Sequence, residues 1–181
     1  TLADWRVQDG KGPTIEVKSL LTTFSPFVFF QYTNGKFQLR AKSILAQAGE
    51  HMNLLSGYGI SSYNEDGTIT YTPMQDWASF VSFQYGKKFQ VMGMLGYMKQ
   101  LGTTKDVTTI WINDSADDRI QQAFRATPTV AWNLGKFTVS LEYNLTAAEF
   151  GSGYRDARGM FDGEKEWILN HRFICMTKFN F

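Results

Sequence analysis

In segments where polar and apolar residues alternate, the polar positions include a set of six charged residues, five of them basic. They are Arg40, Lys42, Arg125, Glu142, Arg172 and Lys178. Basic side chains gathered on one water-facing wall of low dielectric raise the local concentration of small anions. We therefore expect this set to attract anionic solutes. The alternative is that the charges pair with opposite charges elsewhere and only keep the surface hydrated.

Catalytic chemistry finds little support in the residue types. The chain holds two histidines, His51 in a polar stretch and His171 in an alternating segment with no carboxylate next to it. A catalytic site in this chain would need a nucleophile, a base and an orienting group close together. We therefore expect no enzyme and no catalytic residues.

Metal binding has one weak candidate. Asp114, Asp117 and Asp118 offer the hard oxygen ligands that Ca²⁺ takes, but acidic clusters in polar stretches are more often hydrated loops. The single cysteine, Cys175, excludes an internal disulfide and argues against a thiolate metal cluster. We expect it to pack as a small apolar residue. The sequence thus predicts neither a metal nor a cofactor.

Composition narrows the class of protein. The net charge is +1, which gives no electrostatic reason to expect nucleic acid as a partner. Aromatic residues are abundant, with 15 Phe, 8 Tyr and 5 Trp. No run of about 18 apolar residues is present, so no membrane-spanning helix is expected. The length predicts a single domain over residues 1–181.

A Gly-Lys motif followed closely by Phe recurs three times. Its glycines are Gly35, Gly86 and Gly135, which lie about 50 residues apart, and such a period indicates a repeated structural unit. The pair Asn34–Gly35 suits a type I′ hairpin turn because both residue types tolerate positive φ. We expect short turns at 33–36, 86–88 and 133–136.

Seven segments alternate with the period of two that side chains follow along a strand. The predicted strands are 25–33, 36–48, 76–85, 88–101, 122–133, 137–148 and 167–181. Longer polar connections, expected as loops, fill 49–75, 102–121 and 149–166. Short turns at one end, long loops at the other and strands of about ten residues are typical of an antiparallel, up-and-down transmembrane β-barrel.

Aromatic side chains crowd the short-turn ends of these strands. The set expected to form a girdle is Phe30, Tyr32, Phe37, Phe83, Tyr85, Phe89, Trp132 and Phe137. Aromatic girdles mark the lipid–water boundary of membrane barrels, so we expect the apolar face to meet lipid and the polar face to line the interior. The alternative is a soluble sandwich or lipocalin-like barrel, although sandwich turns usually recur every 8–12 residues.

The final segment, HRFICMTKFNF (171–181), resembles the closing strand of bacterial outer-membrane proteins, which ends in Phe and is read by the barrel assembly machinery. This resemblance covers about residues 24–181. It implies an assembly signal made of Phe173, Phe179 and Phe181, and a bacterial outer-membrane location. Cys175 and Thr177 depart from the pattern, because bulkier apolar residues are usual there.

The Gly-Lys turns and the segment SPFVFFQYTNGKFQLRAKSILAQAGEHMNL (25–54) further resemble porins of the Bacteroidetes, of the general type grouped with DcaP-like diffusion channels. That resemblance implies passive diffusion of small hydrophilic solutes through a water-filled lumen, and the basic set described above would favour anionic ones. The lipid bilayer would surround the barrel, and a homotrimer is one option for its assembly. The alternative function is a small filled barrel that acts as a structural or surface-binding protein through its long loops.

The strand count leaves the size of the barrel open. Bacterial barrels use even numbers of strands, and seven is odd. The segment TIEVKSLLT (14–22) is either an eighth strand or an extension of the strand at 25–33, and the rest of 1–23 is expected as loop. We expect the C-terminal portion of a larger barrel rather than a compact eight-stranded one, because TLADWRVQDGKGP (1–13) resembles the interior of a loop.

Overall fold

The computed structural model describes residues 2–3, 18–19, 21–49, 54–55, 57–64, 68–111, 120–153 and 155–179, and its regular structure is all β. The strands are β1 (Leu2–Ala3), β2 (Lys18–Ser19), β3 (Phe27–Asn34), β4 (Phe37–Gln47), β5 (Tyr58–Tyr63), β6 (Ile69–Gly86), β7 (Phe89–Thr103), β8 (Thr109–Trp111), β9 (Ile120–Ala126), β10 (Thr129–Leu134), β11 (Phe137–Gly151) and β12 (Lys165–Phe179). The described residues include no helix able to cross a membrane. The prediction of an antiparallel all-β chain is confirmed.

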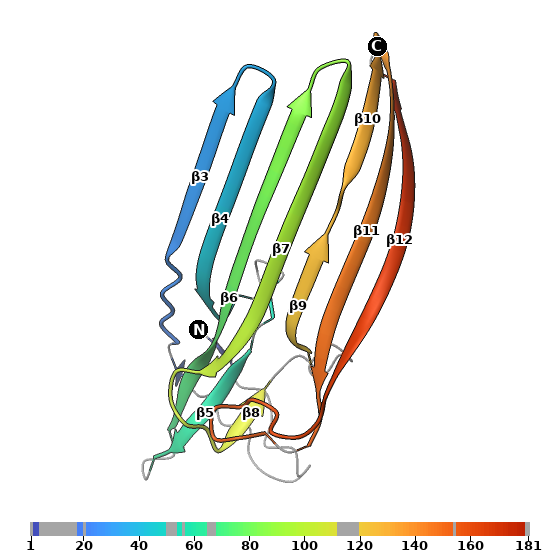
Figure 1. The fold of residues 1–181 in the computed structure, drawn as a ribbon. Coiled ribbons are helices and arrows are strands. Elements are labelled where there is room, and N and C mark those ends of the chain that lie inside the picture. The colour runs from blue at the N-terminus through green and yellow to red at the C-terminus, as the bar shows by residue number, and fades with distance from the viewer. Residues whose placement is uncertain are drawn as a thin grey trace.

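One antiparallel sheet of ten strands contains every strand except β1 and β2. Its long strands follow one another as neighbours in the order β3, β4, β6, β7, then β9 with β10, then β11 and β12 (Figure 1). The hairpin turns of β3–β4, β6–β7 and β10–β11 lie together at one end (Figure 1). Gly35, Gly86 and Gly135 have φ of 58°, 109° and 72°, which explains why each turn needs glycine.

The fifth predicted strand, 122–133, is divided in the structure. β9 and β10 both pair with β7 on one side and β11 on the other, so they continue the same line of the sheet. The break falls at Thr127 and Pro128. Proline has no N–H to donate to a ladder and is tolerated in sheets mainly at edges and irregularities, so its presence accounts for the interruption.

The predicted loop at 49–75 is wrong over much of its length. β6 already begins at Ile69, and β5 pairs with that extension, for example Tyr58 with Pro73. β8 then adds to β5 and lies within the predicted loop 102–121. These strands are stabilised by pairing with one another beyond the apolar part of the sheet, and they carry no strong alternation of hydrophobicity that a sequence pattern could reveal.

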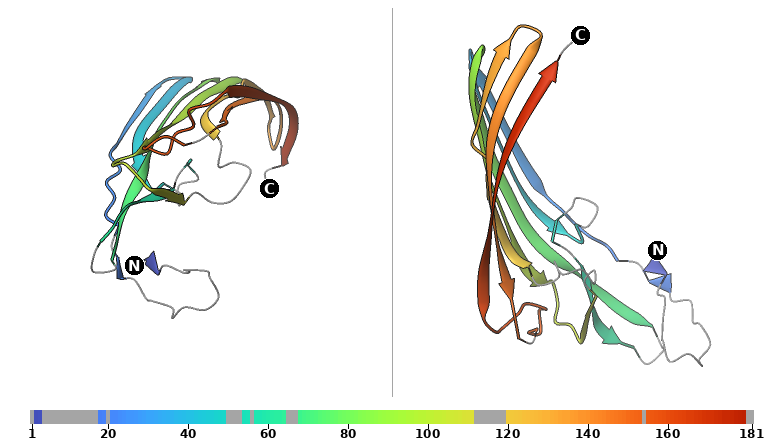
Figure 2. Two further views of the ribbon diagram at one scale, coloured as in Figure 1. Left: turned by 90° about the horizontal axis from the view of Figure 1, so that it is seen from below. Right: turned by 90° about the vertical axis from the view of Figure 1, so that its right-hand side faces the viewer.

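The sheet is strongly curved, and the elements at the long-loop end fold under its arch (Figure 2). β5, β8 and the connection after β11 lie on this concave side (Figure 2). The best buried side chains of the described residues lie here too: Thr72, Met74, Asp76 and Thr103. Thr72 Oγ1 and Thr104 Oγ1 are 2.6 Å apart and share a hydrogen bond. The small core is therefore at the loop end, whereas the turn end is a single layer.

β3 and β12 are the edges of the curved sheet. Within the described residues β3 pairs only with β4, and β12 only with β11. Every residue of β3 is exposed, and so is nearly every residue of β12. The described strands thus form an open arch, and a closed barrel would require pairing partners for both edges.

Several sequence predictions fall outside the described residues. These are the roles of His51, Asp114, Asp117, Asp118 and Phe181. Of the segment 14–22, the structure describes Lys18, Ser19, Leu21 and Thr22. Lys18 and Ser19 pair with β1 in a separate two-stranded sheet, so this described part adds no strand to the arch.

Candidate functional site

The concave side of the arch carries the predicted charges, together with apolar side chains that include Phe27, Phe29 and Phe80. We use the word rung for a set of residues that pair with one another across neighbouring strands. One rung runs from Lys42 through Phe80 and Gly96 to Arg125. Side chains on one rung share a face, so Lys42 and Arg125 project from the same side at the same height, although their strands are not adjacent.

The next rung of the same face, toward the turns, carries two more cations. Arg40 pairs with Ser82, which pairs with Met94. Thr127 continues this rung by donating its N–H to the carbonyl of Met94 at 2.9 Å. On the far side of the arch Arg172 pairs with Asn144. Arg40, Arg125 and Arg172 are all exposed, so their guanidinium groups are open to solvent.

Arg125 is held by hydrogen bonds on the concave face. Its Nε donates to Asn144 Oδ1 at 3.2 Å, and Thr146 Oγ1 donates to the same oxygen at 3.1 Å. Asn144 is only 6% exposed, which keeps that acceptor in place. A guanidinium has five N–H donors, so Arg125 keeps donors for a solute. Lys42 Nζ lies 5.2 Å from the ring centroid of Phe27, within cation–π range.

The two remaining charges of the predicted set stand nearer the turns. Glu142 accepts a hydrogen bond from Thr129 Oγ1 at 3.2 Å, and it belongs to the same rung as Gln38, Gln84 and Met92. Lys178 pairs with Thr138, close to the β10–β11 turn. A shallow cavity of about 210 Å³ lies among this part of the face, lined by Gln38, Arg40, Ser82, Phe83, Gln84, Met92, Gly93, Met94, Thr127 and Thr129. The six predicted residues thus share one face.

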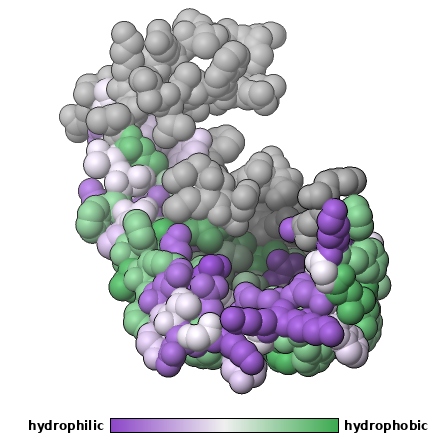
Figure 3. Space-filling view, turned by 90° about the horizontal axis from the view of Figure 1, so that it is seen from above, coloured by the Kyte–Doolittle hydropathy of each residue, from purple (hydrophilic) through white to green (hydrophobic). Residues whose placement is uncertain are grey.

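The opposite, convex face is apolar and widely exposed. Hydrophobic residues gather on the outer side of the arch, and hydrophilic ones cover the turn end (Figure 3). Seven members of the predicted aromatic girdle are exposed large hydrophobics, from Phe137 at 38% to Tyr85 at 57%; Phe37 is partly buried. Phe89 and Trp132 pack edge to face with centroids 5.4 Å apart. An exposed apolar face of this extent marks a surface that contacts a membrane or another protein.

A second aromatic border crosses the convex face at the loop end. Trp77, Tyr97 and Trp167 project from β6, β7 and β12, and Trp77 packs edge to face on Tyr97 at 5.6 Å. Sequence reasoning missed this border because it considered aromatic residues only near the turns. The signal was present: Trp77 and Tyr97 occupy positions of the same parity as Phe83 and Phe89.

Polar groups accompany this second border. Tyr97 Oη donates to Gln122 Oε1, and Gln122 Nε2 donates to Glu149 Oε2 at 2.7 Å. Lys165 Nζ lies 3.9 Å from Glu149 Oε1. Glu149 is 6% exposed although it belongs to the mostly apolar convex face. The apolar band of the convex face therefore ends at a hydrogen-bonded polar belt, which the sequence did not predict.

The predicted assembly signal and the unused reactive residues lie on the convex face. Phe173 and Phe179 are 82% and 54% exposed, and Cys175 between them is exposed as well. His171 Nδ1 is 2.6 Å from Tyr143 Oη, and the two rings stack. In the described part of the chain, no group of three His, Cys, Asp or Glu side chains is placed to hold a metal ion.

Comparisons of this chain with family models, with curated proteins and with solved structures produced no match.

Proposed function

We propose that this chain forms part of the wall of a porin in the bacterial outer membrane. The porin allows passive diffusion of small hydrophilic, preferentially anionic solutes. The lipid bilayer covers the convex face, and strands that pair with the exposed edges of β3 and β12 close the ring. The similarity to porins of the Bacteroidetes, a homotrimeric assembly and recognition by the barrel assembly machinery belong to this proposal as predictions.

The observation that carries the proposal is the division of the sheet into two unlike faces. The convex face is an apolar band with aromatic borders at both ends, including Trp132 at the turns and Trp77 at the loops. Membrane barrels carry such a band between two aromatic girdles. A soluble sandwich would bury this face against a second sheet, but the band is exposed along β6, β7 and β11.

The anion preference follows from the concave face. Lys42 and Arg125 share a rung, Arg40 and Arg172 stand on the next one, and Glu142 is the acidic member of the predicted set. Unit charges a few ångströms from a permeating ion interact with it by about 1 kcal/mol or more at intermediate dielectric, and salt screens the effect. The sum of these charge interactions is attractive for anions and repulsive for cations.

A filled barrel with a structural or binding role is the second candidate. It is favoured by the elements beneath the arch at the loop end, where β5 pairs with β6 and β8 pairs with β5. Met74 and Thr103 are fully buried there. The turn end has no such filling among the described residues, and the arginines of the concave face stay exposed. This contrast supports the channel.

The test is ion selectivity in a planar bilayer under a KCl gradient. The parent should conduct with a reversal potential that indicates anion preference. Reversal of Arg40, Lys42 and Arg125 to Glu should move the reversal potential toward cation preference. A matched control, Lys36→Glu with Lys87→Glu and Lys136→Glu, changes the net charge equally at the exposed turns and should have a smaller effect.

Two outcomes would contradict the proposal. An unchanged reversal potential after the three reversals on the concave face would show that these residues do not line the conducting path. A parent that inserts into the bilayer without any conductance would support the filled barrel.

A further inference from the structure

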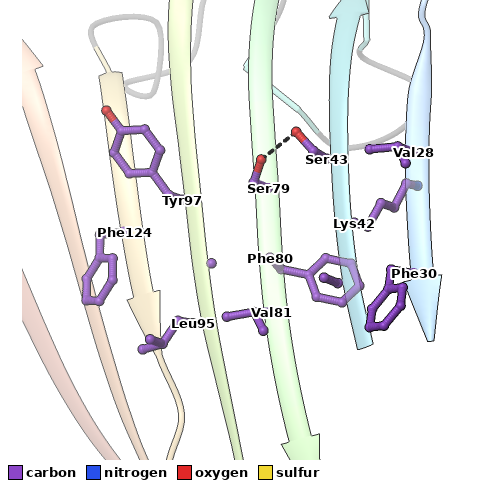
Figure 4. Close-up of a pocket in the computed structure, with 12 residues that line it drawn as sticks. Val28, Phe30, Lys42, Ser43, Ser79, Phe80, Val81, Leu95, Tyr97 and Phe124 are labelled. Atoms are coloured by element: carbon purple, nitrogen blue, oxygen red, sulfur yellow. Dashed lines mark hydrogen bonds between the residues drawn. The ribbon is translucent and has the colours of Figure 1, made fainter. Parts of the chain in front are cut away.

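A cavity of about 410 Å³ opens on the convex face between two successive rungs of that face. Between them runs a rung whose side chains point to the concave face, and its residues Lys42, Phe80 and Gly96 form the floor of the cavity. Figure 4 shows small side chains at Ser43 and Ser79 near the centre, with larger residues at both sides. The volume falls in the range of small-molecule sites, about 300–1,000 Å³.

The two rungs that border the cavity differ in chemistry. The rung nearer the turns is purely apolar: Phe30, Ala41, Val81 and Leu95. The rung nearer the loops carries the hydroxyl groups of Ser43, Ser79 and Tyr97 beside Val28 and Phe124. A ligand with an apolar body and a polar group at its loop-side end would match this order.

Ser43 supplies a hydrogen-bond donor at the polar side. Its Oγ accepts from Trp77 Nε1 at 2.9 Å and from Ser79 Oγ at 2.8 Å. A hydroxyl has two acceptor positions and one proton, so these two bonds leave the Ser43 proton to donate. No acceptor for it occurs among the hydrogen bonds of the residues that the structure describes, and a donor without a partner in apolar surroundings is costly. A carbonyl oxygen in the ligand would satisfy it.

Lys99 adds a positive charge one rung farther toward the loops. It pairs with Trp77 and Gln122 at the polar belt, and its side chain is exposed. Within the described residues Lys99 makes no salt bridge. The strands of Ser43 and Lys99 are two steps apart, which is about 10 Å at the usual strand spacing. An anionic group on the loop side of the cavity is therefore within reach of the Lys99 side chain.

We propose that this cavity binds one acyl chain of a phosphate-bearing anionic lipid in the leaflet at the loop end. The chain lies against Ala41 and Leu95, the ester carbonyl accepts the Ser43 proton, and the phosphate pairs with Lys99. This inference rests on the membrane location proposed above. A second copy of the protein fits less well, because its apolar face would leave Ser43 and Lys99 without partners. Glu149, the carboxylate at that face, is already buried against Gln122.

The experiment is native mass spectrometry of the full chain, folded in detergent and titrated with phosphatidylglycerol. The parent should retain one lipid. Ala41→Phe fills the cavity and should abolish this adduct. Ser43→Ala should weaken binding by about fivefold, the effect of one hydrogen bond. Lys99→Gln should remove the preference over phosphatidylcholine. Val139→Phe, a similar enlargement on the convex face away from the cavity, should retain the adduct.

Equal retention by the parent, Ala41→Phe and Ser43→Ala would overturn the inference. A dimer that Ala41→Phe dissociates would also overturn it, because a second copy would then occupy the cavity. Flotation of the same parent with lipid vesicles and its conductance test the membrane function separately. A parent that floats and conducts but retains no lipid refutes only this inference, whereas a parent that neither floats nor conducts refutes the proposed function on which it rests.

Discussion

Lys42 and Arg125 occupy the same rung of the sheet, joined through Phe80 and Gly96, although two strands separate them. Three strand spacings correspond to about 14 Å along the sheet. On a curved sheet, side chains of one rung on the concave side converge. The two cations therefore act on an ion at the same height inside the arch.

Lys42→Cys and Arg125→Cys, made in a Cys175→Ser background, should both react with a water-soluble, negatively charged thiol reagent. Their modification should lower the conductance to anions, because it adds a negative group at the height where the parent carries a positive charge. Ser79→Cys is the control, since Ser79 stands at a similar height on the convex face. Rapid modification of Ser79→Cys together with protection of Lys42→Cys would reverse the assignment of the faces.

Gly93 makes room for the ring of Phe83. A Cβ at residue 93 would come within 2.7 Å of Phe83 Cε1, whereas a Cβ at Gly96 would meet its nearest atom at 3.9 Å. Gly93→Ala should therefore displace the exposed ring of Phe83 at a cost of about 0.5–1.5 kcal/mol, and Gly96→Ala should have less effect. Urea unfolding in lipid vesicles, followed by tryptophan fluorescence, measures both. Phe83→Leu should suppress the Gly93→Ala defect; no suppression would exclude the ring contact as its cause.

Glu149 ties the polar belt together. It is nearly buried and accepts from Gln122 at 2.7 Å, while Lys165, its partner at 3.9 Å, has a side chain 52% exposed. Glu149→Ala leaves the Gln122 amide without its acceptor and should cost about 1–3 kcal/mol. Lys165→Ala removes an exposed ion pair and should cost less than about 1 kcal/mol. Equal losses in the same unfolding assay would mean that the ion pair, and not the hydrogen bond, stabilises the belt.

The two ends of the sheet should face opposite sides of the membrane. Cysteine tags at Asp106 and Asp162, both exposed at the loop end, should be labelled on intact cells. Tags at Lys36 and Lys136, both exposed in the short turns, should be labelled only after the outer membrane is opened. The reason is that membrane barrels place short turns in the periplasm and long loops outside. Labelling of Lys136→Cys on unbroken cells would contradict this orientation.

The hairpins were predictable because their signals are local. Glycine is favoured where φ is positive, and Gly35, Gly86 and Gly135 mark the turns directly. The strands beside them alternate strongly, since one face is apolar and the other polar. Observed and predicted limits agree within two residues for 27–34, 37–47 and 89–103.

The loop end was less predictable because its structure depends on distant partners. β5 forms through pairing with the extension of β6 and with β8, and neither contact leaves a clear pattern in the sequence. The polar belt has the same origin. Gln122 and Glu149 lie 27 residues apart, and their hydrogen bond exists only because β9 and β11 are in register.

The central claim is that lipid covers the convex face and water the concave one, and adjacent residues of β11 test it most directly. Leu141 is 56% exposed on the convex face, and Ser140 projects to the other side. Leu141→Arg and Ser140→Arg add the same charge. Measured by urea unfolding in lipid vesicles, Leu141→Arg should cost about 2–4 kcal/mol, and Ser140→Arg should cost much less. Equal costs, or a larger cost for Ser140→Arg, would contradict the account.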